Sequence, residues 1–398
     1  MKYLKKRREL RYIPLLILFS LAIVQSCKKD PKTMTNEQIA QELGSESKYK
    51  HLLDYVKSIG INEARFEKKE GSAPVFELLQ EVAYGRKSNI RFVEKTLNPD
   101  SIRIREAAEE LIKGQNVPKV MEKLEPSYPA YITLKAHYAR LIRESKKDSA
   151  RYVANALNAY RWMQRQVQGA PRFVMVNIQG AYLRGMDSLG NVAISMRTVV
   201  GKRDTPTPTM DTYATSIVTH PYWNVPKSIA MREILPKAKS NPDYLTNNKI
   251  EVIDKKGQAV DPSEIDWEAA APENFPYRFR QETGEDNSLG LLKVEIKNPL
   301  AIYLHDTNAR YLFGKDQRWR SHGCVRVQHP TELANFMAGD QLLENDFLTE
   351  QDTTATPPKW HKLQRRIPVF LFYLGADCNE KGQLLYFEDV YKRGAPKV

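Results

Sequence analysis

The chain has 398 residues, of which 61 are Lys or Arg and 48 are Asp or Glu, and its mean hydropathy is −0.55. With 41% hydrophobic residues it has enough apolar side chains for a well-filled core, which excludes a chain that is disordered throughout. The formal net charge of +13 suits an anionic polymer as partner, but no basic motif is interleaved with aromatic residues, so we expect no nucleic-acid binding.

Residues 1–27 have the pattern of a targeting segment. The basic stretch "MKYLKKRRELR" precedes the apolar run "YIPLLILFSLAIV", which is too short for an ordinary membrane-spanning helix. The following "VQSC" resembles a bacterial lipobox, in which the cysteine, here Cys27, is lipidated and becomes the first mature residue. We therefore expect a lipoprotein attached to a membrane on the periplasmic side of the cell envelope. The alternative is an uncleaved membrane anchor, and both interpretations place the body of the protein outside the cytoplasm.

Residues 30–168 are predicted to form a helical scaffold domain. Thr35 and Gln38 are spaced as in a capping box, which marks the start of a helix. Apolar residues then recur every three to four positions in several segments, the first three of which end at glycine. These segments are "KYKHLLDYVKSIG", "APVFELLQEVAYG", "DSIRIREAAEELIKG", "AYITLKAHYARLIRESKK" and "SARYVANALNAYRWMQRQ".

Residues 169–392 are predicted to form a mostly-β, sandwich-like domain, so the fold class is α+β. Strand-like runs rich in β-branched residues begin at "RFVMVNI" and recur up to "IPVFLFYLGAD", with a hairpin-turn composition at "DSLGN". Residues 227–287 are polar, proline-rich and weakly regular, and we expect them to form an inserted lid that covers a cleft. The core of the domain is expected to be a closed or sandwiched sheet.

One thiol lies in a setting that suits covalent catalysis. Thiolate chemistry needs a base for the proton and donors for the oxyanion that forms when a carbonyl is attacked. In "RWRSHGCVRV", Gly323 permits a tight turn before Cys324, and His322 lies two residues before the thiol. A second histidine, His305, ends the strand-like "AIYLH". Spacing alone does not decide which of the two histidines is the base.

The pair "AIYLHDT" and "SHGCVRV" resembles the signature of the L,D-transpeptidases, the YkuD-type catalytic domain of bacterial cell-wall synthesis. The blocks "VVGKRDTPTP", "YWNVPKSIA", "NSLGLLKVEI" and "IPVFLFYL" resemble the flanking blocks of that family in the same order, over about residues 148–392. The long form of the chain is similar to the periplasmic branch with a helical scaffold. No block resembles the peptidoglycan-binding module that some members carry.

The resemblance implies a role for each residue of the site. Cys324 would be the nucleophile, and His305 the base, held by a backbone carbonyl next to it such as that of Asp306. The N–H groups of Gly323 and Cys324 would form the oxyanion hole, in a loop shaped by His322 and Ser321. The remaining candidates would bind substrate: Arg326, which alternates with Cys324 along a strand, Tyr303, and Trp223. Core packing is the alternative for both aromatic residues.

The implied reaction is peptidoglycan crosslinking by acyl transfer. A tetrapeptide stem would acylate the thiol and release D-alanine, and the side-chain amine of another stem would then accept the acyl group. No cofactor or metal is implied, and carbapenems, which resemble the acyl donor, are expected inhibitors.

Four alternatives remain open from the sequence. The first is a metal site made of His305, His322, Cys324 and His329, and the second is a structural disulfide between Cys324 and Cys378. The third is a lipoprotein that binds the cell wall without catalysis. The fourth is a carboxypeptidase or amidase in which water replaces the acceptor amine.

Overall fold

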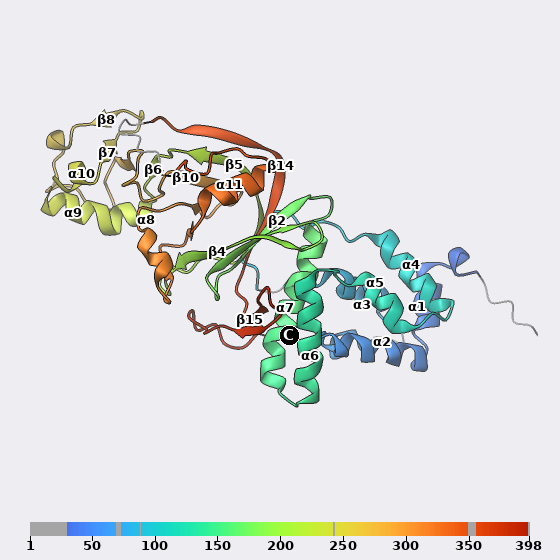
Figure 1. Ribbon diagram of the computed structural model, residues 1–398. Coiled ribbons are helices and arrows are strands. Elements are labelled where there is room, and N and C mark those ends of the chain that lie inside the picture. Colours follow the sequence, from blue (N-terminus) through green and yellow to red (C-terminus); the bar gives the residue numbers. More distant parts are fainter. Residues whose placement is uncertain (1–29, 69–72, 88, 242, 349–355, 397–398) are drawn as a thin grey trace, which may run out of the picture.

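The computed structural model describes residues 30–68, 73–87, 89–241, 243–348 and 356–396. Helices fill the N-terminal part and strands dominate the rest, which confirms the α+β class (Figure 1). Within these ranges no helix is long and apolar enough to cross a membrane. The predicted signal segment, residues 1–27, lies outside the described residues.

The N-terminal part is a bundle of short helices followed by a longer helical hairpin. The helices are α1 (Asn36–Leu43), α2 (Glu46–Ser58), α3 (Val75–Tyr84), α4 (Ser101–Ile112), α5 (Val117–Leu124), α6 (Pro129–Arg143) and α7 (Lys147–Gln166). The predicted capping box is confirmed, because Thr35 and Gln38 each accept a hydrogen bond from the other's backbone N–H. The helix α5 was not expected.

The middle part is one mixed sheet. Its strands are β1 (Phe92–Val93), β2 (Arg172–Asn177), β3 (Tyr182–Asp187), β4 (Val192–Gly201), β5 (Met210–Thr219), β10 (Leu292–Ile296), β11 (Leu304–His305), β12 (Trp319–Ser321), β13 (Val325–Val327) and β14 (Lys359–Phe372). The order among the described residues is β1-β5-β10-β11-β13-β4-β3-β2-β14, with β12 beside β4. Because β14 pairs with both β2 and β5, the sheet closes on itself, and the expectation of a closed sheet is confirmed.

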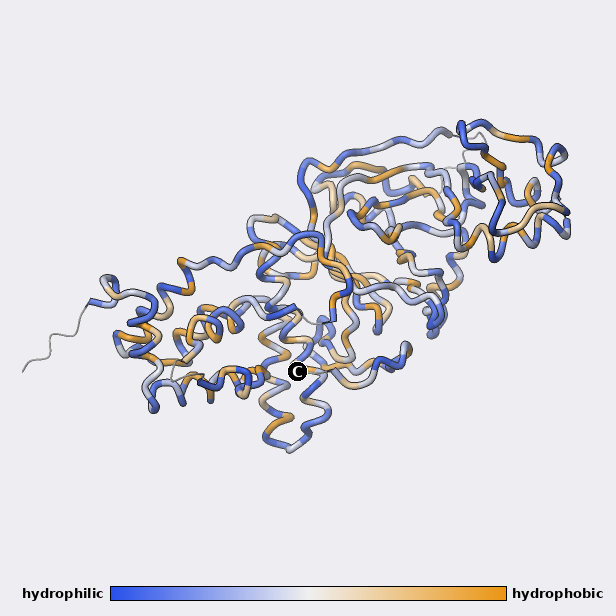
Figure 2. Tube along the Cα trace, turned by 180° about the vertical axis from the view of Figure 1, so that it is seen from behind, coloured by the Kyte–Doolittle hydropathy of each residue, from blue (hydrophilic) through white to orange (hydrophobic). Residues whose placement is uncertain are grey.

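Alternation along β2 explains how the helices attach to this sheet. Val174 and Val176 point into the core of the closed sheet, which the helix α11 (Pro330–Ala338) also enters. Phe173 and Met175 point the other way and pack against α6 and α7. Both faces of β2 are therefore buried, which is why its sequence is continuously apolar (Figure 2).

Buried polar contacts fix α7 against the sheet. The carboxylate of Asp377, in β15 (Ala376–Cys378), accepts hydrogen bonds from the hydroxyls of Tyr160 and Tyr182 and pairs with Arg184 at 3.2 Å. Its side chain is fully buried, so the donors compensate the loss of water around the charge. The carboxylate thus connects α7, β3 and β15. The strand β15 forms a separate pair with β16 (Leu384–Tyr386).

The helical part also contributes a strand, which the sequence did not predict. Within residues 30–168, Phe92 and Val93 of β1 pair in parallel with Met210 and Asp211 of β5. The sequence did not indicate this strand, because two residues are too few to show the alternation of apolar and polar side chains that marks a strand.

The expectation of a weakly regular lid at residues 227–287 is wrong in one respect. The segment and its flanks contain α8 (Lys227–Ile229), α9 (Leu235–Ser240), α10 (Asp243–Asn247), β6 (Trp223–Asn224), β7 (Ile250–Ile253), β8 (Ala259–Val260) and β9 (Arg278–Gln281). As far as the residues are described, the four strands form their own sheet, in the order β6-β9-β7-β8, around an apolar cluster that includes Val252 and Phe279. This insertion lies at the end of the molecule opposite the helical part (Figure 1). Its strands are two to four residues long, so alternation was too brief to recognise.

Candidate active site

The two parts of the suspected signature meet where β11 runs parallel to β13. Leu304 pairs with Val325 and His305 with Arg326, and the N–H of Val325 donates to the carbonyl of Tyr303 at 3.0 Å. Side chains at paired positions of neighbouring strands point to the same face of the sheet, so His305 and Arg326 share one face. Tyr303 and Cys324 each lie two residues earlier on their strands, and they therefore point to that face as well. The structure therefore brings Tyr303, His305, Cys324 and Arg326 to one face.

His305 is buried and its ring is held in one orientation. Its Nδ1 lies in hydrogen-bond contact with the backbone carbonyl of Asp306, as the resemblance implied, and a backbone hydrogen bond with Leu289 also acts on the ring. The Asp306 carboxylate is fixed in turn by the N–H of Leu291 at 2.9 Å and by Arg310. Gly290 is required at this point, because a Cβ there would lie 2.3 Å from the Asp306 Oδ2.

The loop before Cys324 is shaped by glycine and serine. Gly323 has φ of +124°, a conformation that side chains rarely adopt. Ser321 Oγ donates to the carbonyl of Cys324 at 2.6 Å and accepts from the N–H of Gly323 at 3.1 Å. The expected pairing of two oxyanion donors is thus incomplete here, because the Gly323 N–H is engaged by Ser321. The N–H of Cys324 is the other expected donor.

Two threonines after β4 hold the same loop from outside. Thr205 Oγ1 donates to the carbonyl of Ser321 at 3.1 Å, and Thr207 Oγ1 donates to the carbonyl of Gly323 at 2.8 Å. Both come from the "VVGKRDTPTP" block, whose role in the site was not foreseen. Thr207 gives the Gly323 carbonyl a partner, and Thr205 adds a second donor to the Ser321 carbonyl, which also accepts from the N–H of Lys202 at 2.9 Å.

Lys293 joins the site although sequence reasoning missed it. It lies on β10 opposite His305, its Nζ is 3.7 Å from the centre of the Tyr303 ring, and it pairs with Glu295 at 2.6 Å. The available signal was strand alternation in "LLKVEI", which places Lys293 and Glu295 on the same face. Arg326 adds a second cation, and its buried Nε has no hydrogen-bond partner. A buried donor without a partner suits an anionic group of a ligand.

Burial keeps both the thiol and the imidazole neutral. It raises the pKa of Cys324, although the backbone of Tyr303 and the charges of Lys293 and Arg326 lower it in part. Burial, with a smaller contribution from the charge of Arg326, lowers the pKa of His305 to about 3. A neutral imidazole can accept a proton from a neutral thiol as the thiol attacks.

His322 points away from the thiol, toward the insertion. Its Nε2 lies 2.6 Å from the Glu233 Oε1, in the helical turn that follows α8. The insertion therefore touches the loop that carries Cys324. Trp223, by contrast, lies in β6 beside Gln281 and packs against the apolar cluster of the insertion, which favours the packing alternative for this residue.

Comparison with known proteins identifies this region. Residues 171–357 match one family model, described as the YkuD L,D-transpeptidase catalytic domain. These residues are therefore similar to the catalytic domain of that family. A putative L,D-transpeptidase of Haemophilus influenzae is 35% identical over 206 residues, which cover 51% of this chain and 40% of the relative. The chain thus spans less than half the length of that relative.

Two solved structures share parts of the L,D-transpeptidase domain. One is an L,D-transpeptidase from Mycobacterium smegmatis, with 13% identity over 51% of this chain and 59% of the other and a TM-score of 0.22. The second is the catalytic domain from E. faecium L,D-transpeptidase acylated by ertapenem, with 14% identity over 51% and 97% and a TM-score of 0.22. With TM-scores of this size, the arguments about the site rest on the contacts above.

The geometry of the site bears on two alternatives that the sequence left open, the disulfide and the metal site. Cys324 and Cys378 are both free thiols, and Cys378 is buried in β15 with its Sγ 3.7 Å from the carbonyl of Ala130. The disulfide alternative is therefore wrong. Among the described residues, no three His, Cys, Asp or Glu side chains are placed to share a metal ion. His322 faces Glu233 instead of His305, so the suggested ligands do not converge.

The charge of Lys293 should be measurable at the thiol. Since Lys293 lowers the pKa of Cys324, the substitution Lys293→Met should raise it, and the thiolate fraction at a given pH should fall. We expect the pH profile of Cys324 alkylation by iodoacetamide to move to higher pH, with Lys293→Arg close to the wild type. Lys297→Met, an exposed lysine just beyond the same strand, is the matched control. Identical profiles for Lys293→Met and this control would contradict the electrostatic role.

Proposed function

We propose that the protein is a peptidoglycan L,D-transpeptidase that works through a thioester on Cys324. The thiol attacks the amide between the third residue of a tetrapeptide stem and its terminal D-alanine. Its proton passes to the neutral ring of His305 and then to the leaving amine, so D-alanine departs and the thioester remains. The side-chain amine of another stem attacks the thioester, which forms the crosslink and restores the thiol.

The observation that carries this proposal is the shared sheet face of Cys324 and His305, with the His305 ring oriented through Nδ1 by the Asp306 carbonyl. A base of this kind needs a fixed ring and a lone pair directed at its partner. His322 does not meet the second need, because its Nε2 is engaged by Glu233. We therefore assign His305 as the base and His322 as a residue that positions the loop.

Arg326, Lys293 and Tyr303 are proposed to form the substrate side of the site. The partnerless Nε of Arg326 and the nearby ammonium of Lys293 suit the terminal carboxylate of the donor stem. The Tyr303 ring, which faces the ammonium group of Lys293, would offer a flat surface for the peptide. The insertion, which contacts the Cys324 loop through Glu233, is proposed to act as the lid over this face.

Replacement of the nucleophile is the first test. Cys324→Ala should abolish covalent adducts with a tetrapeptide stem and with imipenem or ertapenem, because Cys378, the other thiol among the described residues, is buried in β15. Intact-mass measurement after incubation reports both reactions, and an unchanged thermal melt shows that the fold is retained. An adduct of unchanged yield on Cys324→Ala would refute the assignment. Release of D-alanine without crosslinked product in the wild type would indicate the carboxypeptidase alternative, with water as the acceptor.

The two histidines should behave differently. A general base contributes on the order of a hundred-fold or more to rate, so His305→Ala should slow acylation of Cys324 by at least about that factor. His322→Ser should retain measurable acylation, because its ring contacts the insertion and not the thiol. Stopped-flow acylation by a carbapenem measures both variants. If His322→Ser is the inactive one, the roles must be exchanged.

The location of the protein is proposed from residues 1–27 alone. We propose that Cys27 is lipidated and attaches the chain to a membrane on the periplasmic side of the envelope, where peptidoglycan is present. Cys27→Ala should then move the protein from the membrane fraction to the soluble fraction, or leave an unprocessed precursor of higher mass. A membrane-bound, full-length variant that does not differ from the wild type in mass or fractionation would favour the uncleaved anchor.

A further inference from the structure

The helical part contains a large cavity that the proposed acyl transfer does not use. Its volume is about 1210 Å³, above the range of about 300–1,000 Å³ that is usual for small-ligand sites. It lies between α1, α3 and α7, in the part of the chain outside the catalytic-domain match (Figure 1). Apolar side chains, among them Phe66, Val75 and Phe76, line its middle.

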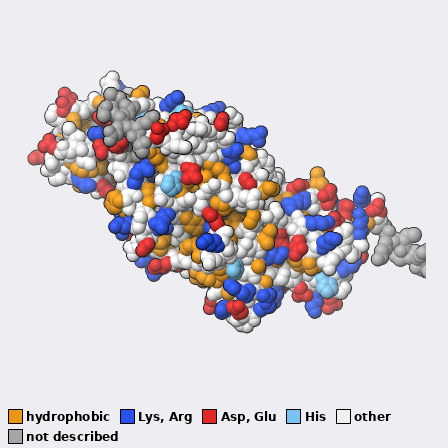
Figure 3. Space-filling model, viewed as in Figure 1, with side chains coloured by type: hydrophobic (Ala, Val, Ile, Leu, Met, Phe, Trp, Pro, Cys, Tyr) orange, Lys and Arg blue, Asp and Glu red, His pale blue; other side chains and the backbone are white. Residues whose placement is uncertain are grey.

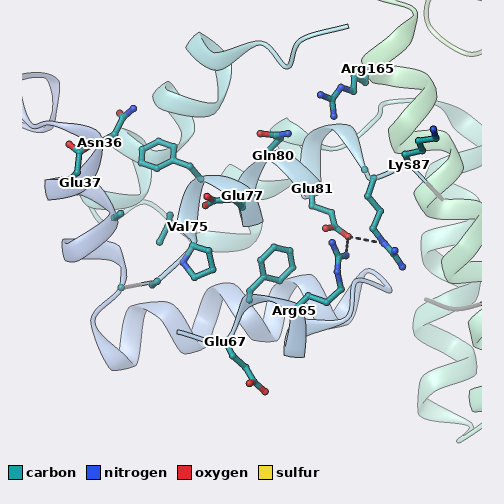
Figure 4. A pocket seen from close by; sticks show the side chains of 18 of the residues that line it. Asn36, Glu37, Arg65, Glu67, Val75, Glu77, Gln80, Glu81, Lys87 and Arg165 are labelled. Carbon is teal, nitrogen blue, oxygen red and sulfur yellow. Dashed lines mark hydrogen bonds and ion pairs between the residues drawn. The ribbon is translucent and has the colours of Figure 1, made fainter. Parts of the chain in front are cut away.

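Charges of opposite sign lie at different ends of this cavity. Four cationic side chains line one end, around the C-terminus of α3, namely Arg65, Arg86, Lys87 and Arg165. Figure 4 shows Arg65, Lys87 and Arg165 on one side of the cavity and Asn36 and Glu37 on the opposite side, with Glu77 between them. The cavity therefore has a basic end, and the carboxylates of Glu77 and Glu37 lie progressively farther from it.

The basic end carries more positive than negative charge. The buried carboxylate of Glu81 is shared by two guanidinium groups, Arg65 in direct contact and Arg86 at 3.8 Å. The pKa of Arg86 is lowered by burial and then by the charge of Arg65, a sign that Glu81 does not neutralise the group. About a third of each guanidine side chain is exposed, so a ligand can reach them.

We propose that this cavity binds uncrosslinked peptidoglycan stem peptides and anchors the enzyme on its polymer. The proposal rests on the function given above. In that function, a stem peptide carries negatively charged carboxylates and also the positively charged side-chain amine of its third residue. The carboxylates would lie at Arg65, Lys87 and Arg165, and the ammonium group near Glu37 and Glu77. In a crosslink the acceptor stem has lost that amine charge while the donor stem keeps its own, so the cavity discriminates against stems that have already served as acceptors.

With this assignment the cavity would provide the attachment to peptidoglycan for which the sequence shows no separate module. No block resembles a separate peptidoglycan-binding module, yet an enzyme acting on an insoluble polymer gains from a second attachment point. Two linked sites raise the effective concentration of substrate at the thiol without any new contact there. The helical part would then serve as the attachment site and the sheet as the catalyst.

The test uses the double variant Lys87→Glu/Arg165→Gln and a matched control, Lys119→Glu/Arg143→Gln, at exposed positions of the helical part that do not line the cavity. Both change the charge equally. In the full-length protein carrying Cys324→Ala, which prevents covalent attachment, we expect the double variant to sediment with isolated sacculi about tenfold more weakly than its control. Acetylation of the amines on the sacculi should weaken binding of the parent protein at least about threefold. Unchanged binding after acetylation would refute the ammonium end.

Activity separates this role from a structural one. With Cys324 intact, the rate on sacculi should fall about fivefold in the double variant relative to its rate on a soluble tetrapeptide. An equal loss on both substrates, or equal sedimentation of the double variant and its control, would overturn the proposal. Failure of the wild type to form a thioester with soluble tetrapeptide would instead refute the acyl transfer, while charge-dependent sedimentation would still support the cavity.

Discussion

The parallel pairing of β11 with β13 is the contact on which the site depends. It joins the strands β1, β5 and β10 to the strands β4, β3 and β2, and it places Cys324 and His305 on one face. The two strands are only two and three residues long, so their own hydrogen bonds do little to hold them. Their position is fixed from both sides, by Asp306 and its partners Leu291 and Arg310, and by Thr205 and Thr207.

Burial at this junction sets the chemistry that the residues can perform. A desolvated thiol and a desolvated imidazole are both neutral at rest, which differs from a preformed ion pair. Lys293 and Arg326 partly offset this for the thiolate while disfavouring a charged ring. In the proposed function the same two cations would also bind the carboxylate of the donor stem. The visible face of the molecule elsewhere carries mixed charges and no continuous basic patch (Figure 3).

An apolar core shared by α6, α7 and β2, together with polar contacts, ties the parts of the chain together. The Asp377 carboxylate connects α7 to the sheet, and β1 extends the sheet with residues from the helical part. The insertion reaches the Cys324 loop through the pair of Glu233 and His322. Each tie links segments that are far apart in sequence. The cavity between α1, α3 and α7 belongs to the part most distant in sequence from the thiol.

The sequence by itself indicated the helical start, the strand-rich second half and Cys324 as the candidate thiol, because capping, periodicity and a short ordered motif are local signals. It also gave the shared face of Cys324 and Arg326, which follows from strand alternation. Spacing left both His305 and His322 open as the base, and only the family resemblance favoured His305. Only the tertiary structure decided that His322 faces Glu233, that Ser321 engages the Gly323 N–H, and that Lys293 lies at Tyr303. It also showed that β1 belongs to the sheet and that residues 227–287 have a core of their own. These outcomes depend on which distant segments become neighbours, and strands of two to four residues carry too little periodicity to reveal their partners.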